Sequence, residues 1–299
     1  MSASGHFDRA NTMNTDAFRD ILYEKTESSG IVVVTLNTPK RKNALRVRTF
    51  LELFQAVEAM EKDTTATAMI LTGANNPEIK DPRKQAFSAG AYFKAGKGFL
   101  GHDDASLSSE EKTQIDFTDI AQKKLTLKLW QFDKPVVAAM NGYAIGAGFT
   151  MLLAGADFIF AADHAWAWLP FAQLAILPEF ASTFLLPRLL GFQKAKEILF
   201  LGEKMPAQQM LDLGLVNKLL PHDELIPFSR HITSRLIPPK GAGLAVKKIK
   251  NALHRPLIDE LSRALDKENK EMNEAFASAD YLEAISARYE QREPRFKGE

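Results

Sequence analysis

Residues 170–183 of the chain, PFAQLAILPEFAST, contain a single ionisable side chain, Glu179, among mostly apolar neighbours. A carboxylate with little water around it has a raised pKa, so it can act as a general base or acid near neutral pH. The alternative role is structural, because a glutamate that follows Pro178 could lie in the first turn of a helix, where its charge is favourable. This stretch alone leaves both interpretations open.

Two glycine-rich turns could stabilise negative charge on a bound ligand. They are FSAGAYFK (87–94) and NGYAIGAGF (141–149), and each follows a predicted strand. Small residues let a ligand approach the backbone, and a helix that begins at such a turn offers N–H groups without intrahelical partners. One such turn more often serves only to pack a strand against a helix, but two together favour an oxyanion site. A dinucleotide site is not indicated, because GYAIGAG lacks the G-x-G-x-x-G spacing and no acidic residue follows at the required position.

The composition excludes several classes of function. The 299 residues are 45% hydrophobic and 25% charged, which is typical of a globular protein with a substantial core. Thirty-eight Lys and Arg residues against 37 Asp and Glu residues leave a net charge of +1, which favours neither nucleic acid nor an anionic membrane as a partner. The chain has no cysteine and its six histidines are scattered, so we expect no disulfide and no metal site.

The sequence also shows no recognisable targeting signal and no membrane-spanning segment. No apolar run approaches the roughly 20 residues that span a bilayer. The first 15 residues are polar and do not resemble a signal peptide, and the final FKGE is not a peroxisomal address. We expect a mobile tail over residues 1–18, within which Met13 could be an alternative start.

Strands and helices that alternate along the chain are expected to position Glu179 and the two glycine-rich turns. Alternating or β-branched segments predict strands over 20–27, 30–37, 66–73, 135–142 and 157–163, with the first two as a hairpin. Apolar residues at helical spacing predict helices over 49–63, about 108–131 and 147–156. This alternation predicts an α/β fold. From about residue 192 strands nearly vanish, so we divide the chain into a core over 19–191 and a helical region over 192–299.

These segments together resemble the crotonase, or enoyl-CoA hydratase/isomerase, superfamily. The resemblance rests on the order and spacing of the two turns together with TPKRKNAL (38–45), KPVVAAMNGYAIGAG (134–148), ADFIFAAD (156–163), PFAQLAILPE (170–179), LLPRLLG (185–191) and AQQMLDLGLVNKL (207–219). It implies a ClpP-like spiral of ββα units followed by a C-terminal helical region that supports a homotrimer or a dimer of trimers. It also implies an acyl-CoA substrate whose thioester oxygen accepts hydrogen bonds from the backbone N–H groups of Ala91 and Ala147. No separate cofactor is expected, because coenzyme A is part of this substrate.

The resemblance further indicates which reaction to expect. Hydratases of the superfamily hold a water between two glutamates, but the matching positions here are Thr150 and Phe171, which cannot act as bases. Glu179 instead resembles the single catalytic carboxylate of the Δ3,Δ2-enoyl-CoA isomerase branch, which carries a proton from C2 to C4 of the substrate. The resemblance therefore implies an isomerase that serves unsaturated fatty-acid β-oxidation in a bacterial-type cytoplasm.

Substrate contacts are expected around the turns and in the basic segment KRKNAL, although surface lysines are more often only solvated. The resemblance places this segment beside the adenine and the pantetheine of CoA. The candidate substrate-binding residues are Lys40, Lys42, Ala44, Ser88, Ala89, Gly90, Lys94, Thr150 and Phe171. A basic residue of the C-terminal helices, Lys247, Lys248 or Lys250, could also reach the phosphates.

Two other functions stay open at this point. A hydratase or thioester hydrolase could use Asp104 or Glu110, in a polar loop over 101–112 that either covers the acyl pocket or only connects elements at the surface. A relative without catalytic acids would bind acyl-CoA without turnover. The tryptophans are expected in the core or in the pocket wall rather than on an interaction surface; they are Trp130, Trp166 and Trp168.

Overall fold

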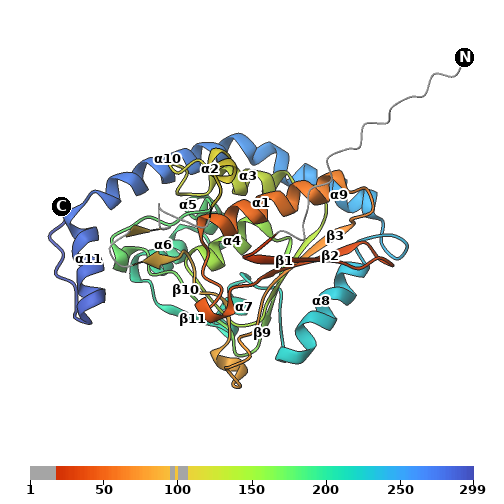
Figure 1. Ribbon diagram of the computed structural model, residues 1–299, viewed down its shortest axis with the longest axis horizontal. Coiled ribbons are helices and arrows are strands. Elements are labelled where there is room, and N and C mark those ends of the chain that lie inside the picture. The colour runs from red at the N-terminus through yellow and green to blue at the C-terminus, as the bar shows by residue number, and fades with distance from the viewer. Residues whose placement is uncertain (1–17, 95–97, 100–106) are drawn as a thin grey trace, which may run out of the picture.

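The computed structural model describes residues 18–94, 98–99 and 107–299. Strands and helices alternate through the first two thirds of the chain, and helices dominate the last third (Figure 1). The predicted α/β class is confirmed. Nearly all of the predicted tail and Asp104 of the predicted loop lie outside the described residues.

A six-stranded sheet forms the centre of the fold, in the order β1-β2-β3-β7-β9-β12. β1 and β2 form the predicted antiparallel hairpin, and every other neighbouring pair is parallel. The strands are β1 (Ile21–Lys25), β2 (Ile31–Leu36), β3 (Ala68–Gly73), β7 (Val136–Met140), β9 (Phe158–Ala162) and β12 (Lys218–Leu220). All residues of β3 and β7 are buried, as expected for parallel strands that are covered on both faces.

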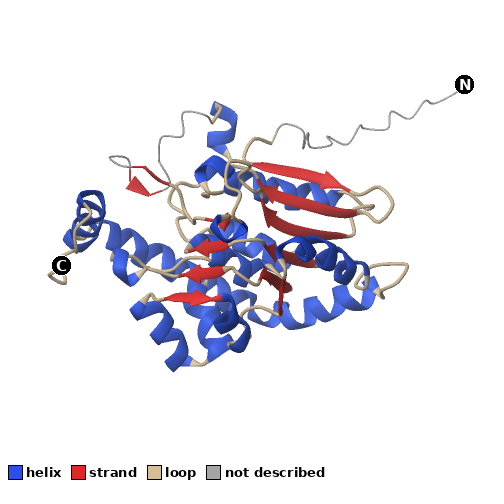
Figure 2. Cartoon of the chain, turned by 90° about the horizontal axis from the view of Figure 1, so that it is seen from below, coloured by secondary structure: helices blue, strands red, loops and turns tan. Residues whose placement is uncertain are grey.

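A second sheet of four strands, in the order β11-β10-β8-β4, lies beside the first (Figure 2). Its strands are β4 (Ala86–Ser88), β8 (Tyr143–Ile145), β10 (Trp166–Trp168) and β11 (Lys204–Pro206), and β5 (Phe93–Lys94) pairs separately with β6 (Gly98–Phe99). Three times the chain runs from the first sheet to the second and then on to a helix. In two of these units Gly90 follows β4 and Gly146 follows β8, so the parallel pairing of β4 with β8 brings the two glycine-rich turns together.

Helices cover both faces of the large sheet (Figure 1). α1 (Val47–Lys62), α3 (Lys123–Gln131) and α4 (Ala147–Gly155) pack together on one side, and α8 (Leu225–Ser234) packs against β3, β7 and β9 on the other. The remaining helices are α2 (Ser109–Thr113), α5 (Ser182–Leu190), α6 (Phe192–Leu201), α7 (Ala207–Asp212), α9 (Gly243–His254), α10 (Ile258–Phe276) and α11 (Ala279–Glu290). Within the described ranges, no helix combines the length and the apolar character needed to cross a bilayer.

The predicted continuous helix over 108–131 is wrong, because the loop 114–122 separates α2 from α3. Within the loop, Asp116 accepts a hydrogen bond from the backbone N–H of Thr118, and Asp119 accepts one from the N–H of Lys123. Gln122 has a left-handed φ of 59°. Aspartate side chains that bond to nearby backbone N–H groups compete with helix formation, which explains the break.

The sequence analysis missed five strands that have only three residues each: β4, β8, β10, β11 and β12. β11 extends the second sheet and β12 extends the first, although both follow residue 192. Strands this short are too brief to show a clear alternation of apolar and polar residues. The helical region predicted from residue 192 onward therefore contributes an edge strand to each sheet.

Candidate active site

A cavity of about 290 Å³ lies where the two glycine-rich turns meet the segment that contains Glu179. Both turns contribute backbone to it, and its other walls come from β8, β10, the loop after β10 and α11. It is lined by Lys42, Ala89, Gly90, Ala91, Tyr143, Ile145, Gly146, Ala147, Trp168, Pro170, Phe171, Leu174, Ile176, Glu179, Ile285 and Arg288.

The two turns pack directly on each other. Gly90 has a φ of +83°, and a Cβ at this position would lie 2.4 Å from the carbonyl oxygen of Ile145. Only glycine fits there. The hydroxyl of Ser88 accepts a hydrogen bond from the Gly90 N–H and donates one to the carbonyl oxygen of Asn43, which fixes the first turn from behind.

The backbone N–H groups of Ala91 and Ala147 are free to bind an oxyanion. Both residues line the cavity, and neither N–H has a hydrogen-bond partner within the described part of the chain. Ala147 is the first residue of α4, so the partial positive charge of that helix end adds to its donor strength. The loss of one donor of an oxyanion hole typically costs about 3 kcal/mol of transition-state stabilisation.

Glu179 lies next to the second turn. A Cβ on Gly146 would be 4.0 Å from Oε1 of Glu179, so the carboxylate borders the residue that precedes Ala147. The Glu179 residue is only 4% exposed, and the hydroxyl of Thr150 lies 3.3 Å from Oε1 as a hydrogen-bond donor. Glu179, Ala91 and Ala147 thus line the same cavity.

Burial raises the pKa of Glu179 to about 8, and the negative charge of Glu268 adds to this effect. The hydrogen bond from Thr150 acts in the opposite direction and lowers the pKa. A carboxyl group with a pKa near the working pH exists in both protonation states, so it can accept and return a proton at similar cost. This is the property that a proton shuttle requires.

The structural interpretation of Glu179 as a first-turn helix residue does not agree with the fold. α5 begins only at Ser182, three residues later. The Glu179 carbonyl oxygen accepts hydrogen bonds from the N–H and the hydroxyl of Ser182, whereas its side chain points into the cavity.

Only some of the other predicted substrate-binding residues line the cavity. Lys42, Ala89, Gly90 and Phe171 line the cavity, and Ala44, Ser88 and Thr150 are buried outside its lining. The prediction for Lys40 is not supported, because its exposed side chain lies outside the cavity, with Nζ 3.5 Å from the Glu78 carboxylate. For Lys94, the backbone belongs to β5 and the side chain lies outside what the structure describes.

None of the C-terminal lysines proposed as phosphate ligands lines the cavity. Lys247 pairs with Asp133, and Lys250 is buried, with Nζ 2.8 Å from Asp157. Lys248 borders a separate surface pocket beside Leu244. These positions do not reach the cavity because α9 packs beside α3, away from the two turns.

The basic residue of the C-terminal region that does reach the cavity is Arg288, on α11, beside Ile285. Sequence reasoning missed it, because no motif marks this helix and its position depends on where α10 ends. α11 packs against the loop after β10, at the mouth of the cavity. Arg288 is exposed, so its guanidinium remains accessible to an anionic ligand.

The tryptophans and the alternative acids are also placed by the structure. Trp168 lines the cavity, Trp166 stacks on Tyr143, and Trp130 is buried against His254, as expected for wall and core residues. Glu110 is exposed on α2 and does not line the cavity.

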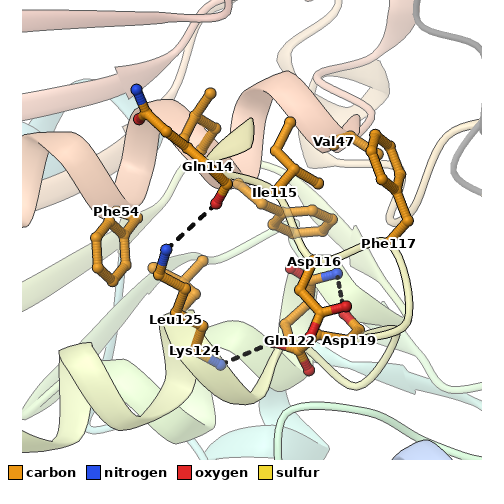
Figure 3. Close-up of a pocket in the computed structure, with 12 residues that line it drawn as sticks. Val47, Phe54, Gln114, Ile115, Asp116, Phe117, Asp119, Gln122, Lys124 and Leu125 are labelled. Carbon is orange, nitrogen blue, oxygen red and sulfur yellow. Dashed lines mark hydrogen bonds between the residues drawn. The ribbon is translucent and has the colours of Figure 1, made fainter. Parts of the chain in front are cut away.

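A second cavity, of about 70 Å³, lies between α1, the loop 114–122 and α3 (Figure 3). Phe54, Ile115 and Phe117 surround it, and Nζ of Lys124 closes one side by donating to the carbonyl oxygen of Gln114. Neither glycine-rich turn contributes to this cavity, so it lacks the two free backbone donors. We therefore assign the candidate active site to the larger cavity.

The chain is similar to known proteins over most of its length. The model of the enoyl-CoA hydratase/isomerase family matches residues 26–299. The chain is 33% identical over 280 residues to a crotonyl-CoA hydratase of Syntrophomonas wolfei, covering 94% of this chain and 98% of that protein. It is 28% identical over 274 residues to a 1,2-epoxyphenylacetyl-CoA isomerase of Escherichia coli, covering 90% of this chain and 95% of that protein.

Solved structures give the same result. The crystal structure of an enoyl-CoA hydratase/isomerase from Pseudoalteromonas atlantica superimposes with a TM-score of 0.76 at 25% identity, covering 93% of this chain and all of that one. The spiral core and the C-terminal helical region expected from the sequence are thereby confirmed. On the match of nearly the whole sequence and of the fold, the chain belongs to the enoyl-CoA hydratase/isomerase family of the crotonase superfamily.

Proposed function

We propose that the protein isomerises 3-enoyl-CoA thioesters to 2-enoyl-CoA thioesters, with Glu179 as the only acid-base group. The observation that carries the proposal is the composition of the cavity wall. Among the described residues that line it, Glu179 is the only carboxylic acid, and it lies beside Gly146, the residue that precedes Ala147. Isomerisation of this kind needs one group that removes a proton and then returns it elsewhere on the same molecule.

In the proposed reaction the thioester oxygen binds between the N–H groups of Ala91 and Ala147. The Glu179 carboxylate removes a proton from C2, and the electrons of the C–H bond delocalise over the C3–C4 double bond and the thioester as a dienolate. The two N–H groups stabilise the oxyanion. The Glu179 carboxylic acid then delivers the same proton to C4, which leaves the double bond between C2 and C3 and restores the carboxylate.

The apolar surroundings favour this reaction over one that uses water. Phe171, Leu174 and Ile176 line the wall beside Glu179, and they exclude solvent from the dienolate. By the resemblance, Thr150 and Phe171 match the positions where hydratases of the superfamily carry their two glutamates. In a hydratase mechanism, Glu179 would have to deprotonate the water and also protonate the substrate carbon, because no second acid lines the described part of the cavity.

Hydration of 2-enoyl-CoA is nevertheless the second candidate, because several similar proteins are hydratases by name. The single base would then act on a water molecule rather than on C2. Glu110 is not a candidate for the second acid in this arrangement, since it is exposed on α2 and outside the cavity wall.

Binding of the CoA part would use the cations at the cavity mouth. Lys42 and Arg288 come from distant parts of the sequence and line the same cavity, so both can contact the phosphates. An Arg288→Ala variant should raise the KM for the CoA thioester more than the KM for the corresponding pantetheine thioester, which has no phosphates. Equal changes for the two substrates would assign Arg288 a different role.

We further propose a homotrimer, or a dimer of trimers, as the assembled form. Large apolar side chains are exposed on α6 and on α9, and such surfaces are typical of subunit interfaces. On α6 they are Phe192, Phe200 and Leu201, and on α9 they are Leu244, Ile249 and Leu253. Light scattering on the purified protein should give three or six times the chain mass, and a monomer at micromolar concentration would contradict this proposal.

The function is tested by incubating the protein with trans-3-hexenoyl-CoA and following the absorbance of the conjugated 2-enoyl product. The parent protein should form the product, and Glu179→Gln should lose at least ~1,000-fold in kcat because it keeps the size of the side chain and removes the base. Glu110→Gln is the matched control, and it should retain parental activity. Hydration of 2-hexenoyl-CoA without conversion of the 3-enoyl substrate would instead support the second candidate.

A further inference from the structure

The turn that follows Glu179 has a strained backbone. Phe180 and Ala181 have φ angles of 58° and 55°, in the left-handed region, which costs a residue with a Cβ about 1–2 kcal/mol. Two such residues in succession persist only when their surroundings fix them. Because the turn begins directly at Glu179, whatever fixes the turn also fixes the position of the carboxylate.

Glu268, in the middle of α10, supplies the main contacts to this turn. Its Oε2 accepts a hydrogen bond from the Ala181 N–H at 2.8 Å. Its Oε1 accepts bonds from the N–H of Thr183 at 2.9 Å and from the hydroxyl of Thr183 at 2.6 Å. Glu268 is 1% exposed, so these three bonds are shielded from water.

The next residue of α10 holds the opposite side of the same turn. Oδ1 of Asn269 accepts a hydrogen bond from the Ala121 N–H at 2.6 Å, and the carbonyl oxygen of Ala121 accepts one from the Phe180 N–H at 3.1 Å. Ala121 belongs to the loop that forms the wall of the smaller cavity in Figure 3. α10 therefore fixes the strained turn both directly and through this loop.

We propose that Glu268 is a positioning residue for Glu179: its carboxylate holds the two-residue left-handed turn that directs the Glu179 side chain into the substrate cavity. The proposal rests on the function proposed above for Glu179. Glu268 does not line the substrate cavity, so it acts through the turn and not on the substrate.

Glu268 also acts on Glu179 through its charge. Burial raises the pKa of Glu268 to about 7, although its three hydrogen bonds lower it. When Glu268 is ionised, its negative charge is the second cause, after burial, of the raised pKa of Glu179. Removal of this charge should therefore lower the pKa of Glu179, while the effect of burial remains.

Other charged or titratable side chains border the two glutamates. None of them is a cause of the raised pKa of either glutamate, and Arg188 is already paired with Glu260. Those that share a cavity wall with Glu268 are Arg188 and Lys267, and those that share one with Glu179 are Lys42, Tyr143 and Arg288.

The test uses the full chain with Glu268→Gln and Glu268→Ala, and Glu274→Gln as the matched control on the exposed face of the same helix. In the glutamine variant one amide oxygen remains as an acceptor, so the turn is partly retained and the charge is removed. In the alanine variant all three acceptor contacts are lost, and we expect kcat on trans-3-hexenoyl-CoA to fall about 100-fold, since small misplacements of a catalytic group have effects of this size.

A lower kcat alone would also follow from partial unfolding, so the deciding readout is the titration of Glu179. The activity of Glu268→Gln should rise with pH over a lower range than that of the parent, because the base form of Glu179 appears at lower pH. The carboxyl resonance of Glu179 in 13C-glutamate-labelled protein, identified by its absence from Glu179→Gln, should titrate at correspondingly lower pH. Glu274→Gln should match the parent in both measurements.

The outcomes separate this proposal from the proposed function. If the parent does not isomerise 3-enoyl-CoA but the Glu179 resonance moves in Glu268→Gln, the function is wrong and the coupling of the two glutamates holds. A Glu268→Gln protein with parental kcat and a parental Glu179 titration would overturn the proposal. If Glu268→Ala does not fold, the glutamine variant decides alone.

Discussion

Replacing Glu179 by glutamine should stabilise the folded protein, and the gain should grow as the pH rises. The pKa of Glu179 rises from an ordinary value of 4.5 to about 8 in the folded protein, chiefly because the carboxyl group is buried. A raised carboxyl pKa means that the folded state binds the proton more tightly than the unfolded state. The parent protein is therefore most stable, with respect to this group, below pH 4.5, and it loses stability as the pH rises toward 8.

The size of the effect follows from the two pKa values. One pKa unit corresponds to about 1.4 kcal/mol, so the full difference between 4.5 and about 8 corresponds to about 5 kcal/mol. About 3 kcal/mol of this is already lost at pH 7. The glutamine side chain has no ionisable group, so Glu179→Gln should be more stable than the parent by about 5 kcal/mol at pH 9 and nearly equal to it at pH 5.

The assay is urea unfolding of the parent and the variant at pH 5, 7 and 9, at one fixed protein concentration because assembly also affects apparent stability. Glu110→Gln is the control, since Glu110 is exposed and its replacement should change nothing at any pH. Equal stability of the parent and Glu179→Gln at pH 9 would refute the reasoning. It would mean that the carboxylate is solvated, and a solvated carboxylate would not have the basicity proposed for the shuttle.

Three further variants test the surroundings of the site. Thr150→Val removes the hydrogen bond that lowers the pKa of Glu179, so the pH profile of kcat should move to higher pH; an unchanged profile would mean that the hydroxyl donates only to the carbonyl oxygen of Gly146. Gly90→Ala places a Cβ 2.4 Å from the carbonyl oxygen of Ile145 at a φ of +83°, so the first turn must move and initial rates should fall about 100-fold, whereas parental rates would argue against a rigid oxyanion hole. Lys250→Ala leaves Asp157 without its buried partner and should lower the free energy of unfolding by about 3 kcal/mol in urea titrations without changing KM for acyl-CoA; a raised KM at parental stability would restore Lys250 as a phosphate ligand.

Several features of the fold could be predicted from short stretches of sequence. The β-branched runs of β2, β3 and β7 and the helical spacing of α1 indicated the α/β class, because burial on one or two faces leaves a periodic pattern. The prediction of one continuous helix over 108–131 was wrong, and the reason is also local. Asp116 and Asp119 offered the backbone an alternative to helical bonding, and periodicity does not report that competition.

Only part of the candidate site could be predicted from short stretches of sequence. The two glycine-rich turns and the lone Glu179 stand out locally, because the residue types themselves permit close backbone approach and a desolvated carboxylate. The ion-pair partners of Lys40 and Lys250 could not be predicted, since a basic residue in the sequence does not reveal which partner it faces. One is exposed beside Glu78, and the other is buried with Asp157.

By itself, the sequence therefore determined the alternation of elements, the two turns and the identity of the single carboxylate among apolar residues. The tertiary structure alone decided that Gly146 borders Glu179, that Arg288 reaches the cavity from α11, and that Glu268 holds the strained turn 87 residues away from Ala181. The physical reason is that periodicity records whether a face is buried but not which face covers it. That choice is made by packing and by hydrogen bonds between segments distant in the chain.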